Sequence, residues 1–283
     1  MARPLIEGRH YTTFEQTRPS AGPLAGAAVR VLSTDDEDGA FSAMVEVPAG
    51  TSVLPEEGRS LEVLLLAGSG SLGGEQLKPT FYGFIPRTES HMLTFDTDSV
   101  LFYATGELGT GDGETLVVDP DTVPWRIRIR ENIVPASTAV LVDLVDGAKP
   151  PVTVNANPGG PVSVNIVKFL RAGESDGSSA SLGAMFPGSG LDCAEWHRSV
   201  DEGISLRGDE LVYADGGTVE VGPGCYTWRP ANARHLPKYS HTGHMGFART
   251  REAGWNVTVE YEAEPSWPAL LAAYQSKLGA AQL

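Results

Sequence analysis

The sequence is poor in cysteine and in long apolar runs. Its 283 residues include only two cysteines, Cys193 and Cys225, which cannot make a disulfide framework and fit a reduced pair in the cytosol. The longest aliphatic run, Val63–Ala67, is far too short to cross a bilayer. Residues 1–20 are polar and lack the apolar core of a secretory signal. We therefore expect a cytoplasmic protein without a membrane span.

Basic residues are also scarce. The chain has 21 Lys and Arg against 36 Asp and Glu, which gives a formal net charge of −15. Proteins that bind nucleic acid or anionic membranes need basic surface to neutralise phosphates. This composition excludes both partners and leaves a small molecule as the expected ligand.

Glycine and proline are abundant, with 33 and 20 residues, and they favour many short strands joined by tight turns. Short β-branched or aromatic segments bounded by Gly, Pro or Asp predict strands, for example at 61–66, 82–85, 203–206 and 225–228. Only 267–281 has apolar residues at helical spacing. The sequence predicts an all-β protein with a short C-terminal helix.

An internal repeat divides the chain in two. After Gly50 and after Gly190, landmark residues follow at the same offsets of five, seven, twelve and eighteen: Pro55, Glu57, Glu62, Gly68 and Glu195, His197, Glu202, Gly208. A second block then returns to register, with Tyr82, Pro86 and His91 matching Tyr226, Pro230 and His235. Gly and Pro cluster between the copies, so we expect two domains, 1–145 and 146–283.

These motifs resemble the cupin superfamily, whose first motif runs glycine, five residues, His-x-His, a short gap, Glu, and then glycine. The second motif ends in Pro followed shortly by His. The resemblance covers both halves and implies a bicupin: two tandem jelly-roll (double-stranded β-helix) barrels. It is nearest to cupins related to the metal-binding domain of anti-sigma factors and to acetylacetone-cleaving dioxygenase.

The resemblance implies a metal site in the C-terminal barrel, held by Glu195, His197, Glu202 and His235. Side chains two apart on a strand share a face, so Glu195 and His197 would point the same way. Glu195 stands where the family has its first His, and it either binds the metal or acts as a catalytic base beside the other three. Asp201 is the rival of Glu202. Such ligands suit Fe(II) first, with Mn(II), Ni(II), Cu(II) or Zn(II) as alternatives.

The N-terminal copy departs further from the pattern. Pro55 replaces one ligand, which leaves Glu57, Glu62 and His91 as a possible second metal site. We expect this motif to be degenerate.

Other residues near the motifs could contact a substrate. Tyr226 and Trp228 could form a pocket wall, Arg234 could clamp a carboxylate, and His244 could line the pocket floor. Each of them also has an ordinary structural alternative in a barrel.

Three functions fit these features. The first is a metal-dependent enzyme, a non-haem iron dioxygenase acting on a small oxygenated molecule. The second is a redox-neutral metalloenzyme, namely an isomerase, decarboxylase, lyase or cyclase. The third is a non-catalytic metal- or ligand-binding sensor. Since open jelly-roll edges invite pairing, we also expect a homodimer.

Overall fold

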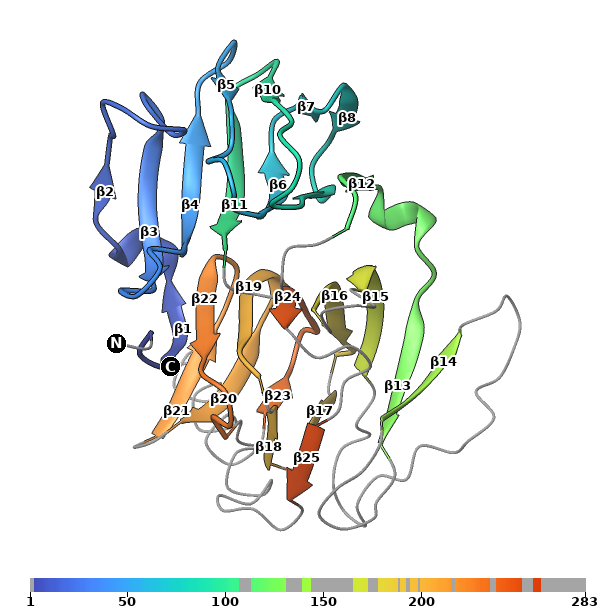
Figure 1. The fold of residues 1–283 in the computed structure, drawn as a ribbon. Helices are drawn as coiled ribbons and strands as arrows, with labels where there is room; N and C mark the ends of the chain where they lie inside the picture. Colours follow the sequence, from blue (N-terminus) through green and yellow to red (C-terminus); the bar gives the residue numbers. More distant parts are fainter. Residues whose placement is uncertain are drawn as a thin grey trace. The chain divides into compact units, whose positions relative to one another are not determined.

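A computed structural model describes residues 3–106, 113–130, 139–143, 165–172, 178–187, 189–191, 194–197, 199–214, 217–234, 238–250 and 257–260. Within these ranges the regular secondary structure is β-strand apart from two short 3-10 helices, which confirms the expected all-β fold class (Figure 1). The helix expected at 267–281 lies outside them. No helix among the described residues is long and apolar enough to cross a membrane.

The chain divides into two compact units, each made of three segments that are not contiguous in the sequence. Unit 1 comprises Met1–Arg3, Tyr11–Val123 and Leu170–Ser178, and unit 2 comprises Pro4–His10, Pro124–Phe169 and Ser179–Leu283. The sequence-based division at 145/146 assumed two continuous domains. A segment near the N-terminus belongs to unit 2 instead, because it pairs with a strand there.

Unit 1 contains a large and a small antiparallel sheet. The large sheet has the order β12 (Leu116–Val118), β9 (Tyr82–Ile85), β6 (Leu61–Ala67), β11 (Ser99–Thr105), β4 (Phe41–Val47), β3 (Ala28–Thr34) and β2 (Gln16–Thr17). The small sheet has the order β5 (Ser52–Val53), β10 (Leu93–Phe95), β7 (Gly70–Leu72) and β8 (Glu75–Leu77). Two short 3-10 helices, η1 (Tyr11–Thr13) and η2 (Pro120–Thr122), flank them.

Unit 2 repeats this plan and adds a third, two-stranded sheet. Its large sheet has the order β1 (Ile6–His10), β22 (Cys225–Arg229), β19 (Asp201–Gly208), β24 (His244–Thr250), β16 (Ser179–Met185), β15 (Asn165–Ala172), β13 (Arg126–Arg130) and β14 (Ala139–Asp143). The smaller sheets have the orders β17 (Ser189–Leu191), β23 (Lys238–Ser240), β20 (Glu210–Ala214), β21 (Gly217–Val221), and β18 (Ala194–His197), β25 (Val257–Glu260).

The two strand orders coincide. The run β9-β6-β11-β4-β3 of unit 1 corresponds to β22-β19-β24-β16-β15 of unit 2, and β5-β10-β7-β8 corresponds to β17-β23-β20-β21. The register agrees as well, since Glu62 lies opposite Phe84 as Glu202 lies opposite Trp228. The repeat seen in the sequence is therefore a repeat of structure.

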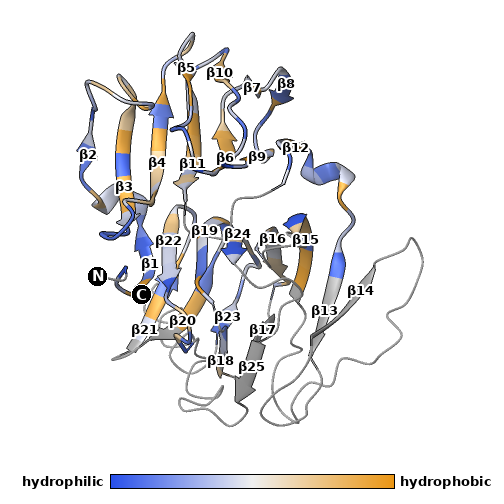
Figure 2. Cartoon of the chain, in the orientation of Figure 1, coloured by the Kyte–Doolittle hydropathy of each residue, from blue (hydrophilic) through white to orange (hydrophobic). Residues whose placement is uncertain are grey.

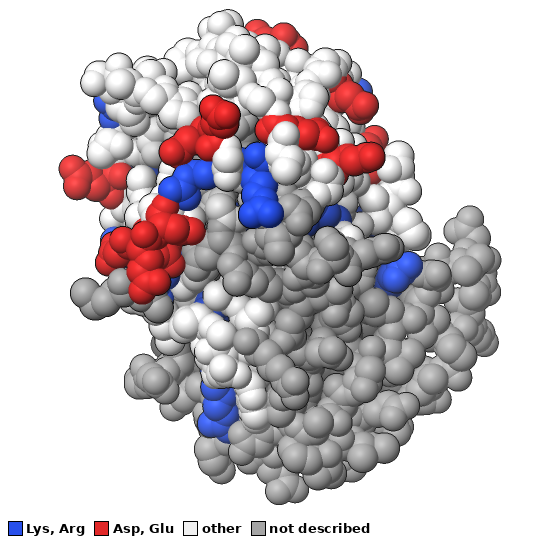
Figure 3. Space-filling view, in the orientation of Figure 1, with Lys and Arg blue, Asp and Glu red and all other residues white. Residues whose placement is uncertain are grey.

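Apolar side chains fill the space between the two sheets of unit 1. Leu61, Val63 and Leu65 of β6 face inward with period two, and they pack against apolar residues of the other strands. Hydrophobic residues recur along β3 and β6 in Figure 2. On the face drawn in Figure 3, acidic side chains gather in several groups on the described surface, as expected from the net charge.

The opposite face of β6 carries a buried charge. Glu62 is only 3% exposed; it accepts a hydrogen bond from the Tyr82 hydroxyl at 2.5 Å and lies 3.2 Å from the Arg171 guanidinium. Unit 2 repeats the cluster: the Tyr226 hydroxyl donates to Glu202 at 2.5 Å, and Arg249 lies 3.3 Å from the same carboxylate. Each carboxylate is thus neutralised by a buried arginine, which buried charge requires.

We predict that Glu62→Ala destabilises the protein by about 3–5 kcal/mol, because it leaves Arg171 buried without its counter-charge. Glu46→Ala is the matched control: its carboxylate also pairs with an arginine, Arg30, but half of its side chain is exposed. Its loss should change the free energy of unfolding by less than about 0.5 kcal/mol. Chemical denaturation measures both, and equal effects would contradict the prediction.

Candidate functional site

Unit 2 contains a cavity of about 150 Å³ in the place where unit 1 has its apolar core. Residues 201, 203 and 205 of β19 and 225, 227 and 229 of β22 line it, in keeping with the period of two. By the repeat, Asp201, Gly203 and Ser205 stand where unit 1 has Leu61, Val63 and Leu65. Smaller and more polar side chains therefore leave a pocket at the position where unit 1 packs Leu61, Val63 and Leu65. The cavity of about 300 Å³ in unit 1 lies elsewhere, beside Val29, Phe41 and Tyr103.

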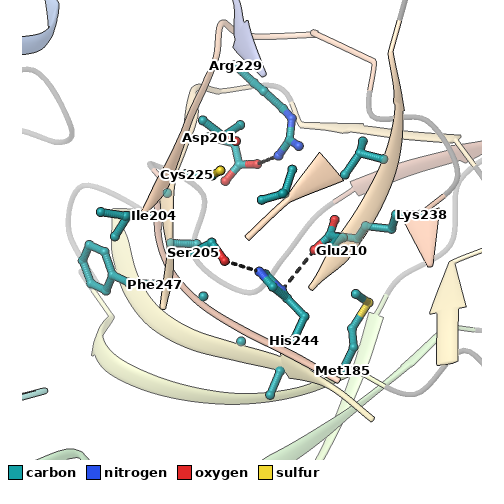
Figure 4. A pocket seen from close by; sticks show the side chains of 18 of the residues that line it. Met185, Asp201, Ile204, Ser205, Glu210, Cys225, Arg229, Lys238, His244 and Phe247 are labelled. Carbon is teal, nitrogen blue, oxygen red and sulfur yellow. Dashed lines mark hydrogen bonds and ion pairs between the residues drawn. The ribbon is translucent and has the colours of Figure 1, made fainter. Parts of the chain in front are cut away.

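One end of the pocket holds a buried arginine between two carboxylates. The Arg229 guanidinium donates to both oxygens of Glu7, one of them at 2.9 Å. It also donates to Asp201 at 3.0 Å (Figure 4). Glu7 arrives on β1, which pairs with β22. Burial opposes the charge of Arg229, but the two carboxylates outweigh it and raise the pKa of the guanidinium. Arg229 is therefore fully charged and already bound on three nitrogens.

At the other end, three polar side chains lie in contact with one another. Ser205 Oγ lies 2.9 Å from His244 Nε2, and His244 Nδ1 lies 3.0 Å from Glu210 Oε2 (Figure 4). Lys238 Nζ lies 3.4 Å from the second oxygen of Glu210. These residues come from β19, β24, β20 and β23, so both larger sheets of unit 2 contribute.

Burial and charge set the protonation of this chain. Desolvation lowers the pKa of His244 and outweighs the opposing effect of Glu210. Burial by itself would raise the pKa of the Glu210 carboxyl, but Lys238 and His244 outweigh it and hold the pKa below its ordinary value. At neutral pH the imidazole is therefore neutral and the carboxylate is ionised.

The structure places the predicted metal ligands in different surroundings. His197 lies in the pocket lining and is 4% exposed. Glu195 lies on the same strand, β18, but its side chain is outside the described set, as is the whole of His235. Glu202 is 0% exposed, is held by Tyr226 and Arg249, and lies outside the pocket lining.

This arrangement does not fit Glu202 as a ligand, since its carboxylate would have to leave two buried partners. Its neighbour Asp201 is the carboxylate that borders the pocket, and Arg229 holds it there. Among the residues that the structure describes, no three His, Cys, Asp or Glu side chains are close enough to hold a metal ion. A metal in this pocket would need His197 together with the undescribed Glu195 and His235 side chains.

The three residues of the possible second metal site are not brought together in unit 1. Glu57 is exposed, Glu62 is bound to Tyr82 and Arg171, and His91 lies half-exposed beside Glu89 at 3.1 Å. The apolar filling of the barrel explains why no polar site forms inside it.

Of the four candidate substrate contacts, only His244 lines the pocket. Tyr226 and Trp228 are buried on the other face of β22, where Tyr226 binds Glu202. Arg234 is exposed and lies outside the pocket lining. The aromatic residues at 226 and 228 therefore stabilise the barrel and do not form the pocket wall.

Sequence analysis missed Glu7, Ser205, Glu210 and Lys238. For Ser205 a signal was present, because Asp201-x-Gly203-x-Ser205 alternates small and polar residues where the first copy alternates Leu, Val and Leu. For Glu7 there was none, since its partner Arg229 lies 222 residues away.

Comparison with solved structures identifies the fold, whereas comparison of sequences finds no match. No known protein-family pattern matches the chain, and no curated protein matches it in sequence. Among solved structures, a Nostoc punctiforme protein provisionally described as a dioxygenase matches with a TM-score of 0.65 at 17% identity, over 93% of this chain and 87% of that one. Escherichia coli protein Ylba matches with a TM-score of 0.60 at 13% identity, over 88% and 94%.

A deletion mutant of Bacillus subtilis oxalate decarboxylase also matches, with a TM-score of 0.51 at 10% identity, over 88% of this chain and 77% of that one. A cupin barrel protein from Leptotrichia buccalis matches at a TM-score of 0.51 and 9% identity, over 88% and 98%. The chain therefore has the cupin jelly-roll fold, as the sequence motifs indicated, and these identities establish the fold alone.

We predict that the imidazole of His244 titrates below 6.5, the ordinary value for histidine, because burial disfavours its charged form. The native state then binds this proton more weakly than the unfolded state. The contribution of His244 to the free energy of unfolding is therefore complete above pH 6.5 and falls as the pH drops toward the lower folded value. NMR titration, with the signal assigned by its loss in His244→Gln, measures the midpoint. A midpoint above 6.5 would contradict the prediction, because it would mean that the charge of Glu210 outweighs desolvation at this ring.

Proposed function

We propose that this chain is a metal-dependent enzyme that acts on a small organic molecule in the pocket of unit 2. The observation that carries the proposal is the position of His197. The cupin motif assigns this residue as a ligand, and it borders the pocket that replaces the apolar core of unit 1. A barrel kept only for packing would have no reason to place charged residues in its interior.

The finer proposal is a non-haem iron dioxygenase, in which His197, Glu195 and His235 hold Fe(II). Two imidazoles and one carboxylate are the ligands of non-haem iron oxygenases, where the metal supplies the activation of O₂. The likeness to the Nostoc protein supports this choice. The remaining pocket residues would bind and orient the substrate and exclude water.

A redox-neutral enzyme is the second candidate, and the Ser205–His244–Glu210 chain favours it. A neutral imidazole held by a carboxylate in a pocket is a suitable general base for an isomerase, decarboxylase, lyase or cyclase. The fold shared with an oxalate decarboxylase is consistent with such chemistry.

The charges that line the pocket restrict the charge of the substrate that can bind there. Arg229 cannot clamp a substrate carboxylate, since Glu7 and Asp201 already occupy it. In the metal-free pocket, the carboxylates of Glu7, Asp201 and Glu210 outnumber Arg229 and Lys238, so an anion away from the metal would meet net negative charge. A cavity of about 150 Å³ is the size that holds benzene. We therefore propose an uncharged molecule of that size class.

We expect metal to co-purify with the chain in a preparation that avoids chelating resin, with iron predominant, and to be lost in His197→Ala. His241→Ala is the matched control, since His241 is exposed and outside the pocket lining. Plasma mass spectrometry measures bound metal in all three proteins. Zinc or manganese in place of iron would favour the redox-neutral enzyme. Metal that survives His197→Ala, or none after reloading, would contradict the metal site.

A second prediction concerns the pocket itself. Gly183 lines it, and a Cβ added there would meet nothing within 4 Å, so we expect Gly183→Val to occupy part of the cavity and to narrow it. A valine also suits a strand better than glycine, so the melting temperature should hold or rise. Phenol, as a small uncharged probe, should shift the NMR signals of pocket residues in wild type and no longer in the variant.

Gly222→Val is the control for that experiment, because Gly222 also has open space around it but lies outside the pocket lining. Phenol binding that persists in Gly183→Val would show that this cavity does not receive the ligand.

A further inference from the structure

The position of the proton on His244 follows from the chemistry of its neighbours. An ionised carboxylate only accepts, and Nδ1 lies 3.0 Å from Glu210 Oε2, so the proton of the neutral ring belongs on Nδ1. In a neutral imidazole the other nitrogen then carries no proton. Ser205 Oγ–H consequently donates to Nε2 at 2.9 Å. The serine hydroxyl is thus paired with a base able to take its proton.

The surroundings hold the imidazole in this position. Lys238 binds the second oxygen of Glu210, which fixes the carboxylate behind the ring. Gly246 leaves room for the ring, since a Cβ at that position would lie 3.2 Å from His244 Cε1. Desolvation keeps the pKa of His244 low against the fields of Glu210 and Asp209, and Lys238 lowers it further. The ring is therefore neutral and oriented before any substrate binds.

Both Ser205 and His244 also border the cavity. The apolar residues Met185 and Val212 line the same cavity, so a molecule that occupies it meets both the polar chain and apolar side chains. The two distances are within the range found between nucleophile, base and orienting acid in enzymes that form acyl intermediates. Such a constellation is recognised by geometry and roles and not by fold or chain order.

We propose that Ser205, His244 and Glu210 form a nucleophilic site that hydrolyses small uncharged esters or lactones. Ser205 is the nucleophile, His244 is the general base and acid, and Glu210 is the positioning residue. The substrate is uncharged for the reason already given, namely that Arg229 is saturated and the lining carries net negative charge. This activity needs no metal and goes beyond the proposed function.

The reaction balances without a further reagent except water. Ser205 Oγ attacks the carbonyl carbon while its proton moves to His244 Nε2. The bond from carbon to the leaving oxygen then breaks, and that oxygen takes the proton from Nε2 to leave as the alcohol. Water attacks the acyl-serine in the same way, giving its proton to Nε2. The carboxylic acid departs as Ser205 Oγ recovers the proton.

The test uses phenyl acetate as substrate and a small alkyl fluorophosphonate as covalent probe, on the full chain with a chelator present. We expect one phosphonyl group per chain, mapped by tandem mass spectrometry to Ser205. In Ser205→Ala and His244→Gln, kcat/KM should fall by roughly 100-fold or more. Ser181→Ala is the matched control, because Ser181 is as buried on β16 but lies outside the pocket lining, so its kcat/KM should be unchanged.

Gly183→Val provides a second test in which all three residues of the chain remain in place. By narrowing the cavity it should abolish both labelling and hydrolysis while the protein stays folded. Hydrolysis or labelling that is absent in wild type, or that persists in Ser205→Ala, would overturn the proposal. Hydrolysis that requires added metal and is unchanged in Ser205→Ala would assign the activity to the metal site instead. The two proposals can therefore fail independently of each other.

The role of Glu210 is tested by the pH profile. The charges facing His244 are those of Glu210, Asp209 and Lys238. Glu210→Gln removes the largest influence that raises the pKa of His244, so the rising limb of kcat/KM should move to lower pH while KM is retained. An unmoved profile would mean that Glu210 does not act through this imidazole.

Discussion

A fully buried carboxylate decides which face of β19 borders the pocket. Glu202 has no exposed surface, so it must meet a buried cation and a hydrogen-bond donor, and Arg249 and Tyr226 supply them. Because side chains alternate along a strand, this placement turns residues 201, 203 and 205 toward the cavity. The structural cluster and the candidate active site are thus two faces of the same strand.

The duplicated scaffold accounts for both the likeness and the difference of the two barrels. Each has the same order of central strands, the same register and a buried Glu–Tyr pair, but the arginine comes from β15 in unit 1 and from β24 in unit 2. On the inward face, however, unit 1 has large aliphatic side chains and unit 2 has Asp, Gly and Ser. The cluster maintains the fold in both units, while the inward face was free to change from a packed core to a polar pocket.

The pocket contains a charged arginine, Arg229, that is already paired with carboxylates, and a neutral histidine, His244, that can accept a proton. Arg229 is bound by Glu7 and Asp201, which keeps that end of the cavity charged but closed to anions. At the other end, Glu210 orients a neutral His244 toward Ser205. Proton transfer is therefore available in the pocket whether or not a metal is held beside His197.

The sequence by itself determined the two-barrel β fold, the repeat, the strand at Tyr82–Ile85 and a motif histidine at 197 that the structure places in the pocket, because these depend on local spacing and on periods of two. It favoured Glu202 over Asp201 as the ligand, whereas the structure buries Glu202 with Arg249 and leaves Asp201 at the pocket, since adjacent residues face opposite ways and only a distant partner decides which one is buried with a cation. Tertiary pairing likewise decided that Ile6–His10 joins the large sheet of unit 2. It also brought Ser205 and His244 together, although they lie 39 residues apart in the sequence. Contacts of that range leave no local pattern, because the free energy that fixes them comes from strands brought together only in the folded barrel.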